Sequence, residues 1–369
     1  MKAIIRFFKR NAVFSIALTV MLITMFIVPP DKQYISYFDV KTLVCLFCVL
    51  AVVCALKNVN FFYFLAKQIV KKFGNLRSCV IALVYITFIG SMLIANDMAL
   101  LTFLPLGFFV LDTTGKRQYM AFTFIMQNIA ANLGGMLTPF GNPQNLYLYS
   151  KFNIPTLEFM QILLLPFLVS ITLITLSCFI FIKPEALSFP KDASVKPDSK
   201  RTVLYLILFV LSIAIVFRGI PYLLGLIIIP LVLLFADKKA LKMVDYPLLL
   251  TFCAFFVFSG NMSRIDAVRD LFSFLLSKST LIFSTLSCQV ISNVPSAILL
   301  SQFTDNYPEL LIGVNIGGTG TFIASLASLI TLREYILRDY EGIKKYIKLF
   351  CDFNFSFLAI LLFISYFTI

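Results

Sequence analysis

Long apolar runs separated by short polar segments cover most of the chain. Each run has about 16 or more mostly apolar residues, which is close to the length that an α-helix needs to cross the hydrocarbon core of a bilayer. We therefore predict about nine membrane-spanning helices. They occupy residues 12–29, 37–57, 118–146, 155–182, 202–218, 220–236, 247–262, 309–331 and 346–369.

Two further apolar runs, residues 79–112 and 279–304, have a different pattern. Each contains two apolar arms around a polar tip, which reads IANDMA in the first run and ISNVPSA in the second. Each arm has about 12 to 16 apolar residues, which is short for a full crossing. We interpret both runs as re-entrant hairpins that enter and leave the membrane on the same side.

The basic residues set the predicted orientation. With a cytoplasmic N-terminus, the predicted cytoplasmic segments hold 24 of the 31 Lys and Arg residues, as the positive-inside rule requires. This bias holds at every loop only if both hairpins return to their side of origin. The pattern predicts a multi-pass protein of the cytoplasmic (inner) membrane with its C-terminus outside.

The order of these elements occurs twice along the chain. Each half has two spans, an amphipathic segment (57–78 or 263–278), a hairpin and two more spans. Because one connecting span lies between the halves, we expect them to have inverted topology. The predicted units are a first repeat at 1–182, a polar cytoplasmic linker with the connecting span at 183–218, and a second repeat at 219–369.

Two of the predicted spans contain residues that break helices. NLGGMLTPFGNPQNL (132–146) and NIGGTGTFIASLASL (315–329) align without a gap at an offset of 183 residues. The glycines and prolines predict a break near the middle of each span, with Pro143 in the first turn of a resumed helix. Inside a bilayer, such backbone lines a wet cavity or is buried in protein.

These breaks have two readings. In the first reading the breaks form a binding site, where their freed N–H groups face an anion and the amides of Asn142 and Asn145 coordinate a cation. Ser325 and Ser328 occupy the matching positions in the second break. The alternative is a kinked helix that packs through small residues and binds no ligand. Two matched breaks, each preceded by a hairpin with Asn at its tip (Asn96 and Asn293), favour the binding site.

The composition agrees with a membrane protein. The chain is 60% hydrophobic with a mean hydropathy of +0.94, whereas soluble domains are about 45–50% apolar. The net charge of +13 lies in loops, so we expect no nucleic-acid partner. The absence of His excludes His-ligated metals and His catalysis. We expect Cys45 and Cys48 to be packing residues. The N-terminal MKAIIRFFKR resembles a signal peptide, but we expect a retained first span.

Four motifs in this order resemble the ion transporter superfamily: ANDMALLTFLPL, NLGGMLTPFGNPQNL, ISNVPSAILL and NIGGTGTFIASLASL. That group includes citrate-transporter-like permeases, divalent anion:sodium symporters, arsenite permeases and some sodium/proton antiporters. The resemblance implies an all-α polytopic fold and elevator-like movement of a substrate-binding unit against a scaffold. It departs from the dicarboxylate symporters, whose tips read Ser-Asn-Thr, because the tips here read Ala95-Asn96-Asp97 and Ser292-Asn293-Val294.

The resemblance also implies the site. It places one Na⁺ at Asn96, Gly141, Asn142 and Asn145, and another at Asn293, Ala324, Ser325 and Ser328. The full set of predicted substrate- or ion-binding residues is Asn96, Asp97, Thr138, Gly141, Asn142, Asn145, Ser292, Asn293, Asn315, Thr321, Ser325 and Ser328.

The leading hypothesis from the sequence is a secondary transporter of a small anion, either a carboxylate or an inorganic oxyanion, coupled to Na⁺ or H⁺. A sodium/proton antiporter or an arsenite efflux permease is the alternative, supported by Asp97, which is either a coupling group or a helix cap. No cluster of catalytic residues points to a membrane enzyme. Beyond the coupling ion we expect no cofactor. The expected partners are the anion, the bilayer and, as one assembly, a second copy in a homodimer.

Overall fold

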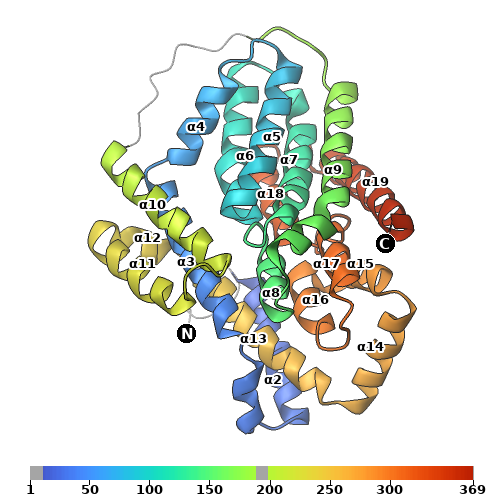
Figure 1. Ribbon diagram of the computed structural model, residues 1–369. Helices are drawn as coiled ribbons and strands as arrows, with labels where there is room; N and C mark the ends of the chain where they lie inside the picture. Colours follow the sequence, from blue (N-terminus) through green and yellow to red (C-terminus); the bar gives the residue numbers. More distant parts are fainter. Residues whose placement is uncertain (1–10, 188–197, 369) are drawn as a thin grey trace.

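The protein is built from α-helices (Figure 1). The computed structural model describes residues 11–187 and 198–368, and within these residues the only extended pairing is an isolated bridge between Asn75 and Ala186. The basic N-terminal segment 1–10, most of the predicted polar linker (188–197) and residue 369 lie outside the described residues. This architecture confirms the all-α fold class.

The helices of the first half follow the predicted order. They are α2 (Ala12–Ile27), η1 (Lys32–Tyr37), α3 (Val40–Asn58), α4 (Phe61–Val70), α5 (Leu76–Ile94), α6 (Asn96–Thr113), η2 (Arg117–Tyr119), α7 (Met120–Gly134), η3 (Gly135–Leu137), α8 (Pro143–Lys151) and α9 (Thr156–Phe181).

The remaining helices occupy the second half. They are α10 (Ser199–Val216), α11 (Tyr222–Ala236), α12 (Lys238–Met243), α13 (Tyr246–Ser263), α14 (Asp266–Lys278), α15 (Thr280–Ile291), α16 (Asn293–Leu300), α17 (Tyr307–Ile316), α18 (Leu326–Ile336) and α19 (Ile343–Thr368).

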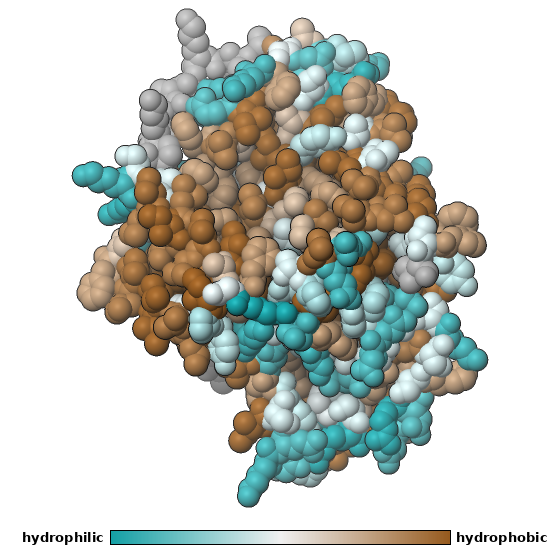
Figure 2. All heavy atoms as spheres, viewed as in Figure 1, coloured by the Kyte–Doolittle hydropathy of each residue, from teal (hydrophilic) through white to brown (hydrophobic). Residues whose placement is uncertain are grey.

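Six helices in the described part of the chain are long and apolar enough to cross a membrane: α3, α5, α9, α10, α13 and α19. Shorter apolar helices include α2 and α11. Large apolar side chains point outward, such as Phe181 on α9 and Phe235 on α11, and Figure 2 shows broad apolar surface with polar residues above and below it. The chain is therefore a polytopic membrane protein, and the number of crossings stays a prediction.

The first hairpin has longer arms than we predicted. α5 has 19 residues and α6 has 18, not the expected 12 to 16. α5 begins early because the Asn75 side chain accepts hydrogen bonds from the N–H groups of Arg77 and Ser78. α6 continues past Pro105, as apolar helices in membranes often do. In the second hairpin, α15 has the expected length of 12 residues, but α16 has only 8.

The two amphipathic segments also differ from each other. α14 occupies almost all of the predicted segment 263–278. The predicted segment 57–78 is wrong as a single element, because only α4 (Phe61–Val70) forms there. α3 ends at Asn58, and Asn60, with a φ of 54°, precedes the first residue of α4 as its N-cap. The end of this segment belongs to α5 instead.

The helices pack as two groups. In one, α3 contacts α10, α11 and α12, while α2 packs along α13. In the other, α7 contacts α5, α6, α9, α18 and α19 (Figure 1). Between the groups, the Arg218 guanidinium in the α10–α11 loop donates to the Tyr149 carbonyl of α8 at 2.7 Å and stacks on the Tyr149 ring. The tips and breaks meet where the two groups face each other.

Candidate functional site

The tip of the first hairpin is fastened to the first break. Ala95, between α5 and α6, has a φ of 64°, which reverses the chain within one residue. The next residue, Asn96, donates its backbone N–H to the Gly141 carbonyl at 3.1 Å. The Asn96 side-chain oxygen accepts the N–H of Asp97 at 2.9 Å and so covers one free donor of the new helix. Asn96 thus lies beside the 141–145 turn, where the sequence predicts a cation site, and the binding of a cation there stays a prediction.

The tip of the second hairpin repeats this geometry. Ser292 has a φ of 76°, and the Asn293 N–H donates to the Ala324 carbonyl at 2.9 Å. The Asn293 side-chain oxygen accepts the N–H of Val294 at 2.9 Å. The Ser292 hydroxyl also donates to the Ala324 carbonyl, at 3.3 Å. Two tips with different sequences therefore adopt the same backbone bend against the same position of each break.

The two threonines of the breaks hold the hairpins in the same way. The Thr138 hydroxyl donates to the carbonyl of Met92, one turn before the first tip, at 2.7 Å. The Thr321 hydroxyl donates to the carbonyl of Gln289, at the matching place in the second hairpin, at 3.1 Å. Thr138 and Thr321 therefore join each break to its own hairpin.

Polar side chains link the two breaks at the centre. The Asn142 amide donates to the Asn315 side-chain oxygen at 3.3 Å, and the Ser325 hydroxyl donates to the Asn132 side-chain oxygen at 2.8 Å. The offset of 183 residues that aligns the two breaks pairs Asn132 with Asn315 and Asn142 with Ser325. The two hydrogen bonds therefore join equivalent pairs of positions in the two halves. Asn132 also accepts from the Asn96 amide at 3.2 Å. The network joins both halves within the buried interior.

Asn145 and Ser328 occupy matching positions with protein partners. The Asn145 amide donates to the carbonyls of Gly135 at 3.3 Å and Met136 at 3.0 Å, and its oxygen accepts from Asn315 at 2.6 Å. The Ser328 hydroxyl accepts from the Asn128 amide at 3.3 Å. Asn145 thus satisfies carbonyls that the unwound segment leaves without helical partners.

Two buried oxygens near the first tip accept no hydrogen bond. They are the side-chain oxygen of Asn142 and Oδ1 of Asp97. The described residues contain no group of three Cys, Asp or Glu side chains that could hold a metal ion. A cation at this tip would therefore be held by amide, carbonyl and single carboxylate oxygens, which are the hard ligands that Na⁺ accepts. Oδ1 of Asp97 accepts no capping hydrogen bond.

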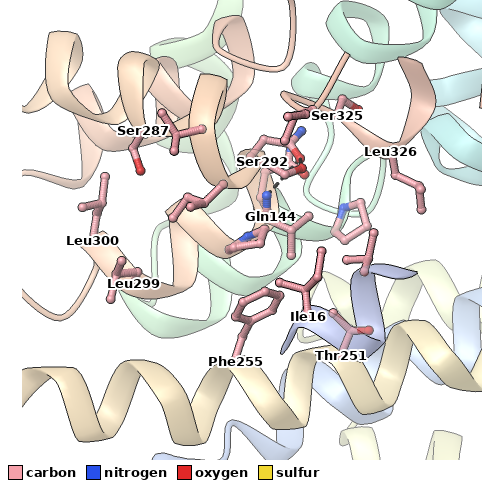
Figure 3. Close-up of a pocket in the computed structure, with 18 of the residues that line it drawn as sticks. Ile16, Gln144, Thr251, Phe255, Ser287, Ser292, Leu299, Leu300, Ser325 and Leu326 are labelled. Atoms are coloured by element: carbon pink, nitrogen blue, oxygen red, sulfur yellow. Dashed lines mark hydrogen bonds between the residues drawn. The ribbon is translucent and has the colours of Figure 1, made fainter. Parts of the chain in front are cut away.

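A cavity of about 810 Å³ opens beside both tips (Figure 3). Four helices begin at its wall: α6 at Asn96, α8 at Pro143, α16 at Asn293 and α18 at Leu326. Of the predicted site residues, Asn96, Asp97, Ser292, Asn293 and Ser325 line this cavity. The others lie in the layer behind it. They are Thr138, Gly141, Asn142, Asn145, Asn315, Thr321 and Ser328.

Sequence reasoning missed four polar residues of this region. Asn128 and Asn132 lie one turn apart on α7 and face the second break, a spacing that could have been read from the sequence. Gln289 donates to the carbonyls of Gly317 at 2.9 Å and Thr319 at 3.0 Å, so it supports the second unwound segment. Gln144 lines the cavity, and both polar atoms of its side chain are buried without a partner.

Comparisons with known proteins find transporters among the proteins that this chain resembles. A family model described as "Citrate transporter" matches residues 3–316. The chain is 34% identical to the uncharacterized transporter MJ0456 of Methanocaldococcus jannaschii over 86% of this chain and 87% of that protein. It is 28% identical to the inner membrane protein YbiR of Escherichia coli over 89% and 87%. Similarity to the silicon efflux transporter LSI3 of Oryza sativa subsp. japonica, at 29% identity, covers 38% of this chain and 28% of that protein.

Proposed function

The chain belongs to the citrate transporter family, and from this premise we propose that it is a secondary active transporter of a small anion, coupled to Na⁺ or H⁺. The observation that carries the proposal is the convergence of four helix N-termini on one cavity. Each N-terminus presents free N–H groups and about half a positive charge. Because no Lys or Arg of residues 11–187 and 198–368 lines this cavity, these N-termini are the means of attracting an anion that the described residues offer.

Coupling is assigned to the first tip. Asp97 lines the cavity with a buried Oδ1 that accepts no hydrogen bond, and Asn142 has a buried free oxygen behind it. An unpaired carboxylate at this depth costs at least about 2.5–3.5 kcal/mol in a membrane. Either a bound Na⁺ or a proton removes that cost, and both remove the repulsion between Asp97 and an incoming anion. The anion therefore binds well only after the coupling ion.

Movement is assigned to the group that holds the tips. Each tip is bonded to its own break, and the breaks are bonded to each other. This unit therefore moves as one body, and we propose that it slides against the group formed by α2, α3, α10, α11 and α13. The inverted repeats (1–182 and 219–369, with the connector at 183–218) would supply equivalent paths to the two membrane faces.

Uptake into liposomes tests the proposal. Purified protein is reconstituted and offered labelled citrate, succinate, sulfate, arsenite and short monocarboxylates under separate sodium and proton gradients. We expect concentrative uptake of at least one anion under one gradient. Uptake that only equilibrates under both gradients would contradict a coupled carrier.

A sodium/proton antiporter is the second candidate, and Asp97 favours it, since a single buried acid can exchange a proton for Na⁺. The same liposomes separate the two functions. An antiporter acidifies or alkalinises the lumen when a sodium gradient is applied without any organic or inorganic substrate anion, whereas the proposed symporter changes lumenal pH only with its anion present.

Asp97→Asn tests the coupling role, because it keeps the size of the side chain and removes its charge. We expect concentrative uptake to be lost, or its dependence on sodium and pH to change. The matched control is Asp112→Asn at the other end of the same helix, where the carboxylate is paired with Arg117 away from the cavity. Unchanged coupling in Asp97→Asn would place the coupling site elsewhere.

A further inference from the structure

We propose that the substrate of this cavity is an amphipathic monocarboxylate, with its carboxylate at the hairpin tips and an apolar body along α2 and α13. The proposal rests on the proposed function and names the substrate class of the same site. It follows from three features of the cavity: its apolar wall, its charge and one unpartnered amide.

The wall opposite the tips is apolar. Val20 and Ile16 of α2, Phe255 and Phe258 of α13, and Phe272 of α14 line it (Figure 3). A small polyanion surrounded by its hydration shell gains nothing from such a wall. An alkyl or aromatic body gains free energy in proportion to the apolar area that it buries there. The volume of about 810 Å³ also exceeds what an inorganic oxyanion fills.

The charge of the cavity fits one negative charge. Among the residues that the structure describes, its lining includes Asp97 and no Lys or Arg. A tricarboxylate would bring three charges to a desolvated site without a cationic side chain, and burial of an uncompensated charge costs several kcal/mol. One carboxylate, in contrast, meets the N-termini of α6, α8, α16 and α18, whose partial charges suffice for a single anion.

Gln144 supplies a donor for that carboxylate. It is the second residue of α8, directly after Pro143, and only 1% of it is exposed. Both polar atoms of its side chain are buried and lack a hydrogen-bond partner, and the residue is part of the cavity wall (Figure 3). Buried amide groups are almost always satisfied. A carboxylate at the tips would accept from the Gln144 amide and complete its hydrogen bonding.

A chain-length series measures the apolar contribution. Acetate, butyrate, hexanoate and citrate are titrated into the purified protein in nanodiscs by isothermal calorimetry, at the sodium concentration and pH that support uptake. Each buried methylene is worth up to about fourfold in affinity. We expect hexanoate to bind at least about tenfold more tightly than acetate, and citrate more weakly than hexanoate.

A matched pair of variants locates the bound molecule. Ile16→Trp fills part of the cavity from a side chain that is already 62% exposed, so folding should tolerate it. Ile23→Trp makes the same change on the same helix, at a residue 54% exposed that does not line the cavity. We expect Ile16→Trp to weaken hexanoate binding at least about tenfold and Ile23→Trp to leave it within about twofold. Gln144→Leu should weaken acetate and hexanoate equally.

The outcomes separate this proposal from the proposed function. Gradient-driven uptake of citrate or sulfate with no hexanoate binding would overturn the substrate class and leave the transporter intact. Hexanoate binding that is unchanged by Ile16→Trp would also overturn the substrate class. This result is expected if a lipid acyl chain fills the apolar part of the cavity. Hexanoate binding that is weakened by Ile16→Trp but not by Ile23→Trp, without gradient-driven uptake of any acid, would support the substrate class and contradict the transport function.

Discussion

The hydrogen bond between Asn145 and Asn315 joins the two unwound segments directly, so we expect its loss to be measurable as a coupling energy. The Asn315 amide donates to the Asn145 oxygen at 2.6 Å, and both residues are at most 1% exposed. The perturbation is a double-mutant cycle with Asn145→Ala, Asn315→Ala and the double variant. A cycle isolates the pair from the other contacts that each residue makes.

The magnitudes follow from the partners. Asn145→Ala removes the donor for the carbonyls of Gly135 and Met136, and each unsatisfied buried group costs about 1–3 kcal/mol, so we expect a total loss of about 2–6 kcal/mol. Asn315→Ala leaves the Asn145 oxygen without its donor and costs about 1–3 kcal/mol. Interhelical hydrogen bonds in membranes couple by about 0.6 kcal/mol on average. Because this bond is short and fully buried, we expect a coupling of about 1 kcal/mol.

The assay is reversible unfolding by dodecyl sulfate in mixed micelles. Far-UV circular dichroism is the readout, since the chain has no Trp for fluorescence. The control cycle pairs Asn145→Ala with Asn354→Ala, because Asn354 donates to Phe350 on its own helix and shares no partner with Asn145. The control should be additive within about 0.3–0.5 kcal/mol. A coupling below about 0.3 kcal/mol for the first pair would refute a direct link between the breaks.

Three further predictions use simpler readouts. In a Cys-free protein, a cysteine at Lys71 should react with an impermeant maleimide only from the cytoplasm and one at Lys278 only from outside. Labelling of both from the same side would contradict the predicted topology. Gly134→Ala should abolish the peak of folded protein in size-exclusion chromatography, because a Cβ there would lie 2.3 Å from a backbone carbonyl of α5. The control is Gly74→Ala, where a Cβ would have no atom within 4 Å, and it should elute normally. Arg218→Gln should lower the free energy of unfolding by about 1–2 kcal/mol through its lost bond to α8; an unchanged value would mean that this contact contributes nothing.

The breaks were predictable from the sequence because backbone chemistry alone determines them. Pro143 lacks an N–H and has a φ suited to a first helical turn, and the structure confirms it at the start of α8. The resemblance of the motifs predicted a cation site at Asn96 and the 141–145 turn, and in the structure Asn96 contacts Gly141. The ligand roles of these residues stay predictions.

Features set by tertiary packing were harder to predict. The arms of the first hairpin were predicted too short, since hydropathy does not show that Asn75 caps α5 or that α6 continues through Pro105. Asn132 has no role in the sequence predictions, although it contacts Ser325 in the other half of the chain. A single sequence gives no sign of which polar side chains in two apolar helices face each other.

The matched tips have a consequence for the energetics of the proposed transport cycle. Asn96 and Asn293 make the same backbone bond to their breaks, at 3.1 and 2.9 Å, after bends of nearly equal φ. If the two halves exchange roles between the outward-open and inward-open forms, the contacts that one half loses are replaced by equivalent contacts of the other half. The two forms then have nearly equal free energy. A carrier of this kind has no built-in direction. The gradients of its substrate and coupling ion decide which way it runs, and modest changes in either gradient reverse it.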